Sequence, residues 1–271
     1  MNNQSDFVRE ICAEENILCE IFSHGYVMRL TKDDRVRHIF GSYWDINSAA
    51  ADRIACDKTA CFLLLSNSGI PAVSHELFSS RCDEKDAWAR AEAFFYAHKK
   101  IVVKPNTGTK GMDVFLCETP VDFETAAFKI FAKYSDAALS PFVEIEREYR
   151  VFFLCGQALF AYGKERGDSW QHNLSRGAEA FEITGDCDAI INLAIRAADC
   201  IGINFASVDV AVLSCGGLAV MEINSGVQAR ILLEQLPHLR PTVKKIYAEA
   251  IHAMLLYAES ETSTKFSFRS F

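Results

Sequence analysis

Apolar runs separated by short polar breaks follow one another along the chain and predict a mixture of strands and helices. Phe205–Leu213 and Leu218–Ile223 flank a Ser-Cys-Gly-Gly turn, a pattern typical of a β-hairpin. Residues 101–114 predict a strand, a loop that contains two glycines, and a second strand that starts near Met112. Both strand pairs carry polar residues beside the apolar ones.

Other segments show the apolar spacing of helices or of strands. Helices are expected over about 5–15, 83–99, 121–134 and 186–200, in two segments around Asp57, and across 228–258. Strands are expected near 17–22, 25–31, 36–40 and 71–78, and an antiparallel sheet is expected within 146–225.

The predicted hairpin carries a cluster of oxygen ligands. Asp209 lies on its first strand, and Glu222 and Asn224 lie two residues apart on the second, so the latter two face the same side. Carboxylate and amide oxygens suit Mg²⁺, which completes its shell with phosphate oxygens and water. The alternative is a strand pair with these polar residues on its solvent face.

A glycine loop follows the strand that ends at Lys104-Pro105. Glycines let backbone N–H groups approach phosphate oxygens, and the loop residues are Gly108, Thr109, Lys110 and Gly111. The loop is not a P-loop, because it lacks the GxxxxGK[ST] spacing and a strand follows it. A hairpin turn is the alternative. Together with the cluster on the hairpin, the loop predicts a nucleotide lid.

These features occur in an order that resembles the ATP-grasp superfamily of carboxylate–amine ligases. Glutathione synthetase, D-alanine–D-alanine ligase and the ligases that add glutamate to a ribosomal protein belong to it. The resemblance covers roughly residues 47–235. Its segments are Asp57-Lys58 with Gly69-Ile70-Pro71, Lys104-Pro105 with the glycine loop, Glu148-Tyr149-Arg150-Val151, Asn173-Leu174-Ser175-Arg176-Gly177, and Asp209 with Glu222 and Asn224.

The resemblance implies an α+β fold of the ATP-grasp type, in which two α+β lobes clasp ATP. We expect a shortened N-terminal domain over 1–45, a small lobe with the phosphate loop over 46–145, a large lobe over 146–258, and a tail over 259–271. The N-terminal segment is shorter than the full α/β domain that is usual in the family. An alternative role for it is to support a homodimer.

The resemblance also implies the residues that bind ATP and a divalent cation. ATP is expected to contact the lysines, the glycine loop, a hinge and a ribose-binding acid, namely Lys58, Lys104, Gly108, Thr109, Lys110, Gly111, Val143, Glu144 and Glu148. Mg²⁺, or Mn²⁺ as an alternative ion, is expected at Asp209, Glu222 and Asn224. A solvated helix face is the alternative for Lys58.

Cations and polar residues complete the implied site. Arg150, Lys164 and Arg176 are expected near the transferred phosphate as catalytic residues, because phosphoryl transfer needs positioning and charge neutralisation. His172, Asn173 and Arg230 are expected to contact the substrate. The alternative for Arg230 is a helix surface.

The implied function is that of an ATP-dependent ligase, which activates a carboxylate as an acyl phosphate and couples it to an amine of an amino acid or peptide. Two other functions share the same ATP-binding residues. One is an ATP-grasp kinase that transfers phosphate to a hydroxyl of a small molecule. The other is a non-catalytic ATP-binding interaction module. Both lysines and the complete set of metal ligands favour an active enzyme over the last function.

Composition and charge indicate which partners and which cellular environment to expect. The 271-residue chain has a net charge of −8 and no Lys/Arg-rich run, so we expect no nucleic-acid binding. No apolar run reaches the roughly 18 residues of a membrane span, and residues 1–16 lack the order of a signal peptide. Ten cysteines are spread without a CxxC pair, which predicts reduced, buried thiols in a cytoplasmic protein. A zinc site is the alternative for the cysteines.

Overall fold

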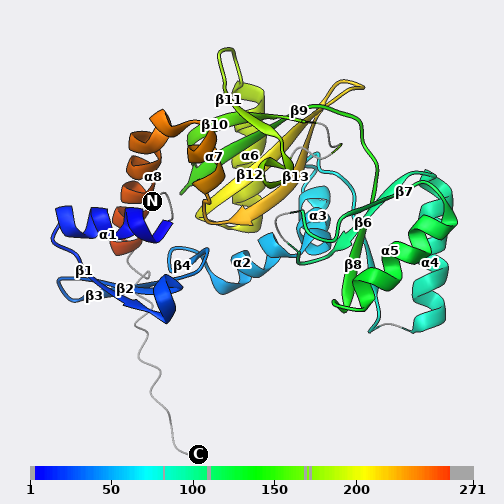
Figure 1. The fold of residues 1–271 in the computed structure, drawn as a ribbon, viewed down its shortest axis with the longest axis horizontal. Coiled ribbons are helices and arrows are strands. Elements are labelled where there is room, and N and C mark those ends of the chain that lie inside the picture. Colours follow the sequence, from blue (N-terminus) through cyan, green and yellow to red (C-terminus); the bar gives the residue numbers. More distant parts are fainter. Residues whose placement is uncertain (1–3, 82, 109–110, 168–169, 171–172, 257–271) are drawn as a thin grey trace, which may run out of the picture.

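The chain forms three antiparallel sheets that follow one another along the sequence (Figure 1). This computed structural model describes residues 4–256 except 82, 109–110, 168–169 and 171–172. A five-stranded sheet occupies the middle of the molecule, and the two four-stranded sheets lie at its two ends (Figure 1). The α+β class expected from the sequence is confirmed.

The N-terminal sheet has the order β1-β2-β3-β4. Its strands are β1 (Leu18–Phe22), β2 (Val27–Lys32), β3 (Arg35–Phe40) and β4 (Tyr43–Trp44). The inner face is apolar, since Met28, Leu30 and Ile39 are buried against α1 (Gln4–Glu14) and α8 (Arg240–Leu256). This sheet thereby shares one core with the C-terminal helix.

The sheet of the small lobe has the order β5-β8-β6-β7. Its strands are β5 (Glu76–Ser79), β6 (Ile101–Pro105), β7 (Phe115–Cys117) and β8 (Asp136–Pro141), and its helices are α4 (Glu84–His98) and α5 (Pro120–Phe131). Both helices pack on one face, where Phe78, Val103 and Leu139 are buried. The helix α5 begins where Thr119 and Asp122 form a capping box.

The sheet of the large lobe has the order β11-β10-β9-β12-β13. Its strands are β9 (Ile145–Leu154), β10 (Gln157–Glu165), β11 (Glu179–Glu182), β12 (Phe205–Leu213) and β13 (Leu218–Ser225). The helix α6 (Asp188–Ile201) covers one face, because its apolar residues recur at helical spacing, as Ile190, Ala194 and Ala197 show. The short helix α7 (Arg230–Gln235) precedes α8.

Two helices and one extended segment join the lobes. The helices are α2 (Ala49–Cys56), which Ser48 caps, and α3 (Lys58–Asn67), which Asp57 caps. The extended segment 71–73 adds to the edge of β13: Val73 N donates to Val220 O, and Val220 N donates to Pro71 O, both at 2.9 Å. Part of the chain that leads into the small lobe is thus bonded to the large sheet.

Three sequence predictions differ from the structure. The strand expected near 71–78 begins at Glu76, because residues 71–73 bond to β13 instead. The strand expected from Met112 begins at Phe115, because Gly111 and Asp113 both have positive φ and form a turn. The helical region 228–258 is interrupted at Pro237, which lacks a backbone N–H. The short strand β4 was not expected.

The thiols and the helices bear on two expectations from composition. The nine described cysteines are free, but Cys155 and Cys215 are exposed in turns, so the prediction of buried thiols is wrong for these two. Among the described helices, none has both the length and the apolar character needed to cross a membrane.

Candidate active site

Six polar residues share one face of the large sheet, which we call the polar face: Glu148, Arg150, Lys164, Asp209, Glu222 and Asn224. Directly paired residues of neighbouring strands project to the same side. Lys164 pairs with Glu148, Arg150 with Asp209, and Asp209 with Glu222, so the set occupies adjacent rows of one face that spans β10, β9, β12 and β13. The helix α6 covers the opposite face.

A β-bulge in the hairpin sets which side chains of β13 face which way. Asp209 pairs with Glu222 while Val210 pairs with Val220, so Met221 is an extra residue on β13. Both Val220 and Ile223 are therefore buried under α6, although their spacing of three would put them on opposite faces of a regular strand. The bulge lets Glu222 project to the polar face between them.

Asp209 lies at the centre of an ion-pair network. Arg150 grips both of its oxygens, with Nε and Nη2 each 2.6 Å from the nearer carboxylate oxygen. Lys164 Nζ lies 3.2 Å from Asp209 Oδ2 and also pairs with Glu148. Asp209 and Lys164 are only 4% and 2% exposed, so these charges are held by each other rather than by solvent.

The network shifts the two acids in opposite directions. Burial acts to raise the pKa of Asp209, but the charges of Arg150 and Lys164 outweigh it and hold the pKa below its ordinary value. Burial dominates for Glu148 and raises its pKa, with Lys164 acting against the shift. Asp209 therefore stays ionised, and Glu148 is the acid more easily protonated.

Glu222 and Asn224 are the polar-face residues with unused capacity. The half-buried carboxylate of Glu222 has no hydrogen-bond or ion-pair partner among the described residues. The amide nitrogen of Asn224 is buried and also without a partner there. A half-turn of the amide would place its oxygen at the same point. With Asp209 opposite Glu222, these groups fit a hard divalent cation.

Lys104 lies on the small lobe and faces the polar face of the large sheet. It lies at the end of β6, and its ammonium interacts electrostatically with Glu222 and Glu148 across the space between the sheets. Burial and then the nearby charge of Lys58 lower the pKa of Lys104 to about 8. A negatively charged ligand between the lobes would stabilise the charged ammonium of Lys104, and so offset both its burial and its repulsion by Lys58.

The start of the glycine loop is pinned to α3. Asn106, which is 3% exposed, accepts hydrogen bonds through Oδ1 from Thr59 N at 3.1 Å and Thr59 Oγ1 at 2.8 Å. Lys58 Nζ donates to Gly108 O at 2.7 Å. The helix α3 packs against the large lobe, so this contact fixes the loop between the two lobes.

The end of the loop contacts the large lobe. Arg176 donates to Gly111 O at 3.0 Å, and Asn173 Oδ1 accepts from Ser175 N at 3.0 Å, which shapes the turn that carries Arg176. A side chain at position 108 would place its Cβ 2.9 Å from Pro105, and Gly111 has φ +63°. Position 108 therefore favours glycine because a Cβ would clash with Pro105, and position 111 favours glycine because of its positive φ.

The remaining predicted residues are placed less directly. Val143 and Glu144 lie between β8 and β9, and Glu144 O accepts from Ser214 N at 2.9 Å, which ties this segment to the hairpin turn. The described partner of Arg230 is Glu234, one turn along exposed α7, and no described contact joins Arg230 to the polar face. Thr109, Lys110 and His172 lie outside the described residues.

Several supporting residues were not foreseen. Asp52 accepts from Ser225 Oγ at 2.5 Å and from Asn47 Nδ2 at 3.0 Å, and all three are buried. This network holds the end of β13, next to Asn224. Thr59 and Asn106 likewise hold the loop. In the sequence, Ser225, Thr59 and Asn106 each lie within two residues of a predicted site residue, which is the signal that could have found them, whereas Asp52 and Asn47 carry no such signal.

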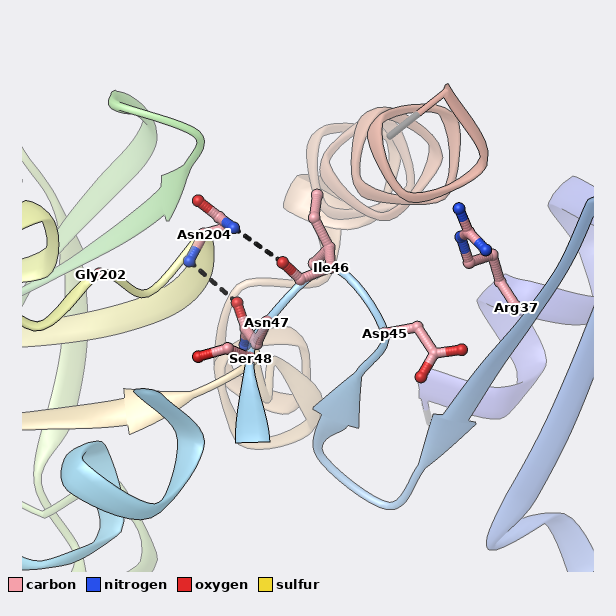
Figure 2. Close-up of a pocket in the computed structure, with 7 residues that line it drawn as sticks. All are labelled: Arg37, Asp45, Ile46, Asn47, Ser48, Gly202 and Asn204. Carbon is pink, nitrogen blue, oxygen red and sulfur yellow. Dashed lines mark hydrogen bonds between the residues drawn. The ribbon is translucent and has the colours of Figure 1, made fainter. Parts of the chain in front are cut away.

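A crevice of about 420 Å³ lies elsewhere, between the N-terminal sheet and the start of β12 (Figure 2). Its polar groups are already used within the protein. Arg37 donates to Met254 O, Asp45 accepts from His38 N, and Asn204 donates to Ile46 O. Figure 2 shows these side chains around the opening. The crevice holds none of the polar-face residues, so we do not place chemistry there.

Comparison with solved structures shows the same fold. D-alanine–D-alanine ligase from Bacillus anthracis matches with a TM-score of 0.62 and 16% identity over 77% of this chain and 70% of that one. The ATP-grasp ligase PsnB, in complex with a minimal precursor, matches with a TM-score of 0.54 and 18% identity over 77% and 64%. A bifunctional glutathione synthetase from Pasteurella multocida matches with a TM-score of 0.57 and 14% identity over 92% and 45%.

The sequence comparison is more specific than these likenesses. Among curated proteins, none matches the chain in sequence. The family model described as the RimK-like ATP-grasp domain matches residues 55–236, which is more than half of the chain. That span contains the glycine loop and the whole polar face. The chain therefore belongs to the RimK-like ATP-grasp family.

Proposed function

We propose that this protein is an ATP-dependent ligase that activates a carboxylate as an acyl phosphate and couples it to an amine. Members of the ATP-grasp family are mostly ATP-dependent ligases. The observation that carries the proposal is the polar face, where acids and cations span four strands opposite Lys104. A face that includes Glu222, which has no partner among the described residues, suits a ligand made of phosphates and a metal ion.

ATP-grasp ligases in general use divalent metal ions, and we propose Mg²⁺ for this one, with Mn²⁺ as an alternative. Glu222, Asn224 and Asp209 would hold it, because the first two have free capacity on the polar face and the third lies opposite Glu222. When bound, the ion supplies charge neutralisation to the phosphate oxygens. Arg150 keeps Asp209 ionised and oriented.

ATP would lie between the two sheets. Lys104, which has no described hydrogen bond of its own, would bind phosphate oxygens, and Lys58 would stay beside the loop that it holds. The backbone of the hinge at Val143 and Glu144 would contact the base. Glu148 would bind the ribose after exchanging its contact with Lys164 for the hydroxyls.

The chemical step needs positioning more than proton transfer. A carboxylate oxygen of the substrate attacks the γ-phosphorus in line, the bond to ADP breaks, and an acyl phosphate forms. The amine then attacks the acyl carbon, phosphate leaves, and the amine releases a proton. Arg150, Lys164 and Arg176 would neutralise the phosphoryl oxygens. Residues 106–111 would cover the intermediate and exclude water.

The substrates are small molecules or peptides in this proposal. The PsnB structure contains a precursor, and the other neighbours are named for D-alanine and glutathione. Asn173, His172 and Arg230 are the residues that we assign to the acceptor. Of these, Asn173 has support from its position beside Arg176. The cytoplasmic location expected from the cysteine content stays a prediction.

A homodimer is the oligomeric state that we propose. The outer face of the N-terminal sheet carries large apolar side chains that are 43–58% exposed, namely Leu18, Phe22, Tyr26, Val36 and Phe40. The ion pair of Glu20 and Arg29 lies on the same outer face, between these apolar side chains. Such a face, with both charges in its middle, can pair with a second copy of itself about a two-fold axis.

The test is a screen for ADP release against amino acids and dipeptides, with mass detection of products. We expect an amide product that depends on ATP and a divalent ion. Glu222→Gln should abolish turnover with an unchanged melting midpoint, because this carboxylate has no described partner in the fold. Glu92→Gln, an exposed acid on α4, is the control and should keep full activity. A phosphate ester as product would show a kinase, and wild-type turnover in Glu222→Gln would refute the metal assignment.

A further inference from the structure

His75 is a buried imidazole that the proposed reaction does not use. It lies one residue before β5 and is 5% exposed. Its ring packs 6.2 Å from the ring of Phe62, which comes from α3. Because α3 packs on the large lobe and β5 belongs to the small lobe, His75 lies where the two lobes meet.

The hydrogen-bond pattern fixes the state of the ring. Nδ1 lies 2.9 Å from Val73 O, and a carbonyl oxygen only accepts, so Nδ1 carries the hydrogen. Burial, with the charges of Lys104 and Lys58, lowers the pKa of His75 well below its ordinary value, so the ring is neutral. The other nitrogen, Nε2, then presents a lone pair. It is buried and has no partner among the described residues.

The strand register places this lone pair on the face where a nucleotide would lie. Lys104 pairs with Ala138, and Ala138 pairs with Leu77, so these three project to one side of the small sheet. His75 precedes β5 and is two residues before Leu77, and the electrostatic interaction of its ring with Lys104 places it on the same side. The helices α4 and α5 cover the opposite side. Lys104 and His75 thus share the side of the small sheet that is turned away from α4 and α5.

The residues around His75 indicate which chemical group could donate a hydrogen bond to Nε2. Val102 and Ala138 give this face small, flat apolar side chains between Lys104 and the hinge at Val143. A planar ring fits such a surface. Its edge must supply a hydrogen-bond donor, because a buried acceptor without a donor is unfavourable. A purine with an amino group at position 6 meets both conditions, whereas the 6-oxo group of guanine would oppose the lone pair.

We propose that His75 reads the base of the nucleotide, with Nε2 accepting a hydrogen bond from the 6-amino group of adenine. This inference rests on the proposed binding of ATP between the lobes. An amino group has two hydrogens, so a hinge carbonyl takes one and His75 takes the other. His75 thereby selects ATP over nucleotides that lack the donor.

The test compares three ligands on the full chain by calorimetry: Mg-ATP, the triphosphate of purine riboside, which lacks only the 6-amino group, and Mg-GTP. We expect wild type to bind ATP about tenfold more tightly than the purine riboside triphosphate. His75→Phe keeps an aromatic ring but has no acceptor, so its preference for ATP should fall to the part that the hinge carbonyl supplies. His75→Gln, whose amide oxygen can accept, should recover part of the preference. His98→Phe, on the exposed end of α4, is the matched control and should behave as wild type.

A second measurement does not depend on a variant. The ¹⁵N resonance of His75 Nε2 in the wild-type protein should shift on adding Mg-ATP and not on adding the purine riboside triphosphate. Equal affinity of wild type for these two ligands, or an undiminished preference for ATP in His75→Phe, would overturn the role of His75 and leave ATP binding intact. Failure of every triphosphate to bind would overturn the proposed function and this inference together.

Discussion

Lys104 shows how a single residue of this site affects stability. Its ammonium is half-buried, has no described hydrogen bond, and lies near the charge of Lys58. The pKa of Lys104 falls from an ordinary 10.5 to about 8. At about 1.4 kcal/mol per unit, such a shift is an upper limit of about 3 kcal/mol of unfavourable free energy, which solvent screening reduces.

Lys104→Met should therefore stabilise the fold while it removes nucleotide binding. At pH 7 we expect the free energy of unfolding to rise by about 1–2 kcal/mol, measured by denaturant titration. Because the folded pKa is lowered, the penalty in wild type is complete below pH 8 and disappears as pH rises toward 10.5. The gain of the variant should shrink over that window. Lys245→Met, on an exposed turn of α8, should show neither effect, and a destabilised Lys104→Met would contradict the argument.

Among the elements, the hairpin of β12 and β13 was the most predictable. Its apolar runs and its Gly-Gly turn are local signals, and they predicted a hairpin that carries Asp209, Glu222 and Asn224 together. The pairing of Asp209 with Glu222 is a finding of the structure. The bulge at Met221 was not predictable from the local sequence, because it depends on the packing of Val220 and Ile223 under α6. Local pattern thus identifies the strand, while a distant helix decides its irregularity.

The glycine loop shows the same division. Its glycines and lysines predict a phosphate-binding loop, but the contacts of the loop with other segments cannot be predicted from the local sequence. Arg176 reaches Gly111 O from 65 positions away, and Lys58 reaches Gly108 O from 50 positions away. Such long-range pairs depend on the arrangement of whole lobes. The role of Arg230 stays a prediction, since its described partner is on its own helix and no described contact joins it to the polar face.

Valine in place of Gly108 and Gly111 should damage turnover much more than folding. Valine at 108 would press on Pro105, and Gly111 has a positive φ that a β-branched residue adopts poorly. We expect ATP turnover to fall at least tenfold, with a melting midpoint within a few degrees of wild type. Gly185→Val, where a Cβ meets no atom within 4 Å, is the control. Full activity in the double variant would reduce this loop to a hairpin turn.

For the whole molecule, nucleotide should act as a clamp between the lobes. A ligand that binds only the folded state stabilises it by about 2.7 kcal/mol at a hundredfold excess over Kd. Mg-ATP should therefore raise the melting midpoint, measured by calorimetry, and slow amide exchange in residues 106–111. Lys104→Ala should lose most of the rise. Stabilisation by NAD or GTP without any by ATP would be incompatible with the proposed function.

The proposed dimer makes a separate prediction. Phe40→Glu places a charge in the apolar outer face of the N-terminal sheet, where Phe40 is 50% exposed and packs on Tyr26. Sedimentation should show a wild-type dimer at tens of micromolar and a monomer for the variant, with the ATP-induced rise in melting midpoint retained. Phe128→Glu, on α5 where Phe128 is 65% exposed, should remain dimeric. A monomeric wild type would remove the proposal.

The extended segment 71–73 gives the molecule a thermodynamic property that neither sheet has alone. His75 donates to Val73 O, Val73 donates to Val220 O, and Val220 stands two residues before Glu222. Whatever fixes the base at His75 thus also fixes β13 beside the residues assigned to the metal ion. Affinities for base and cation become linked, and linkage is reciprocal. The factor by which the base strengthens cation binding must equal the factor by which the cation strengthens base binding.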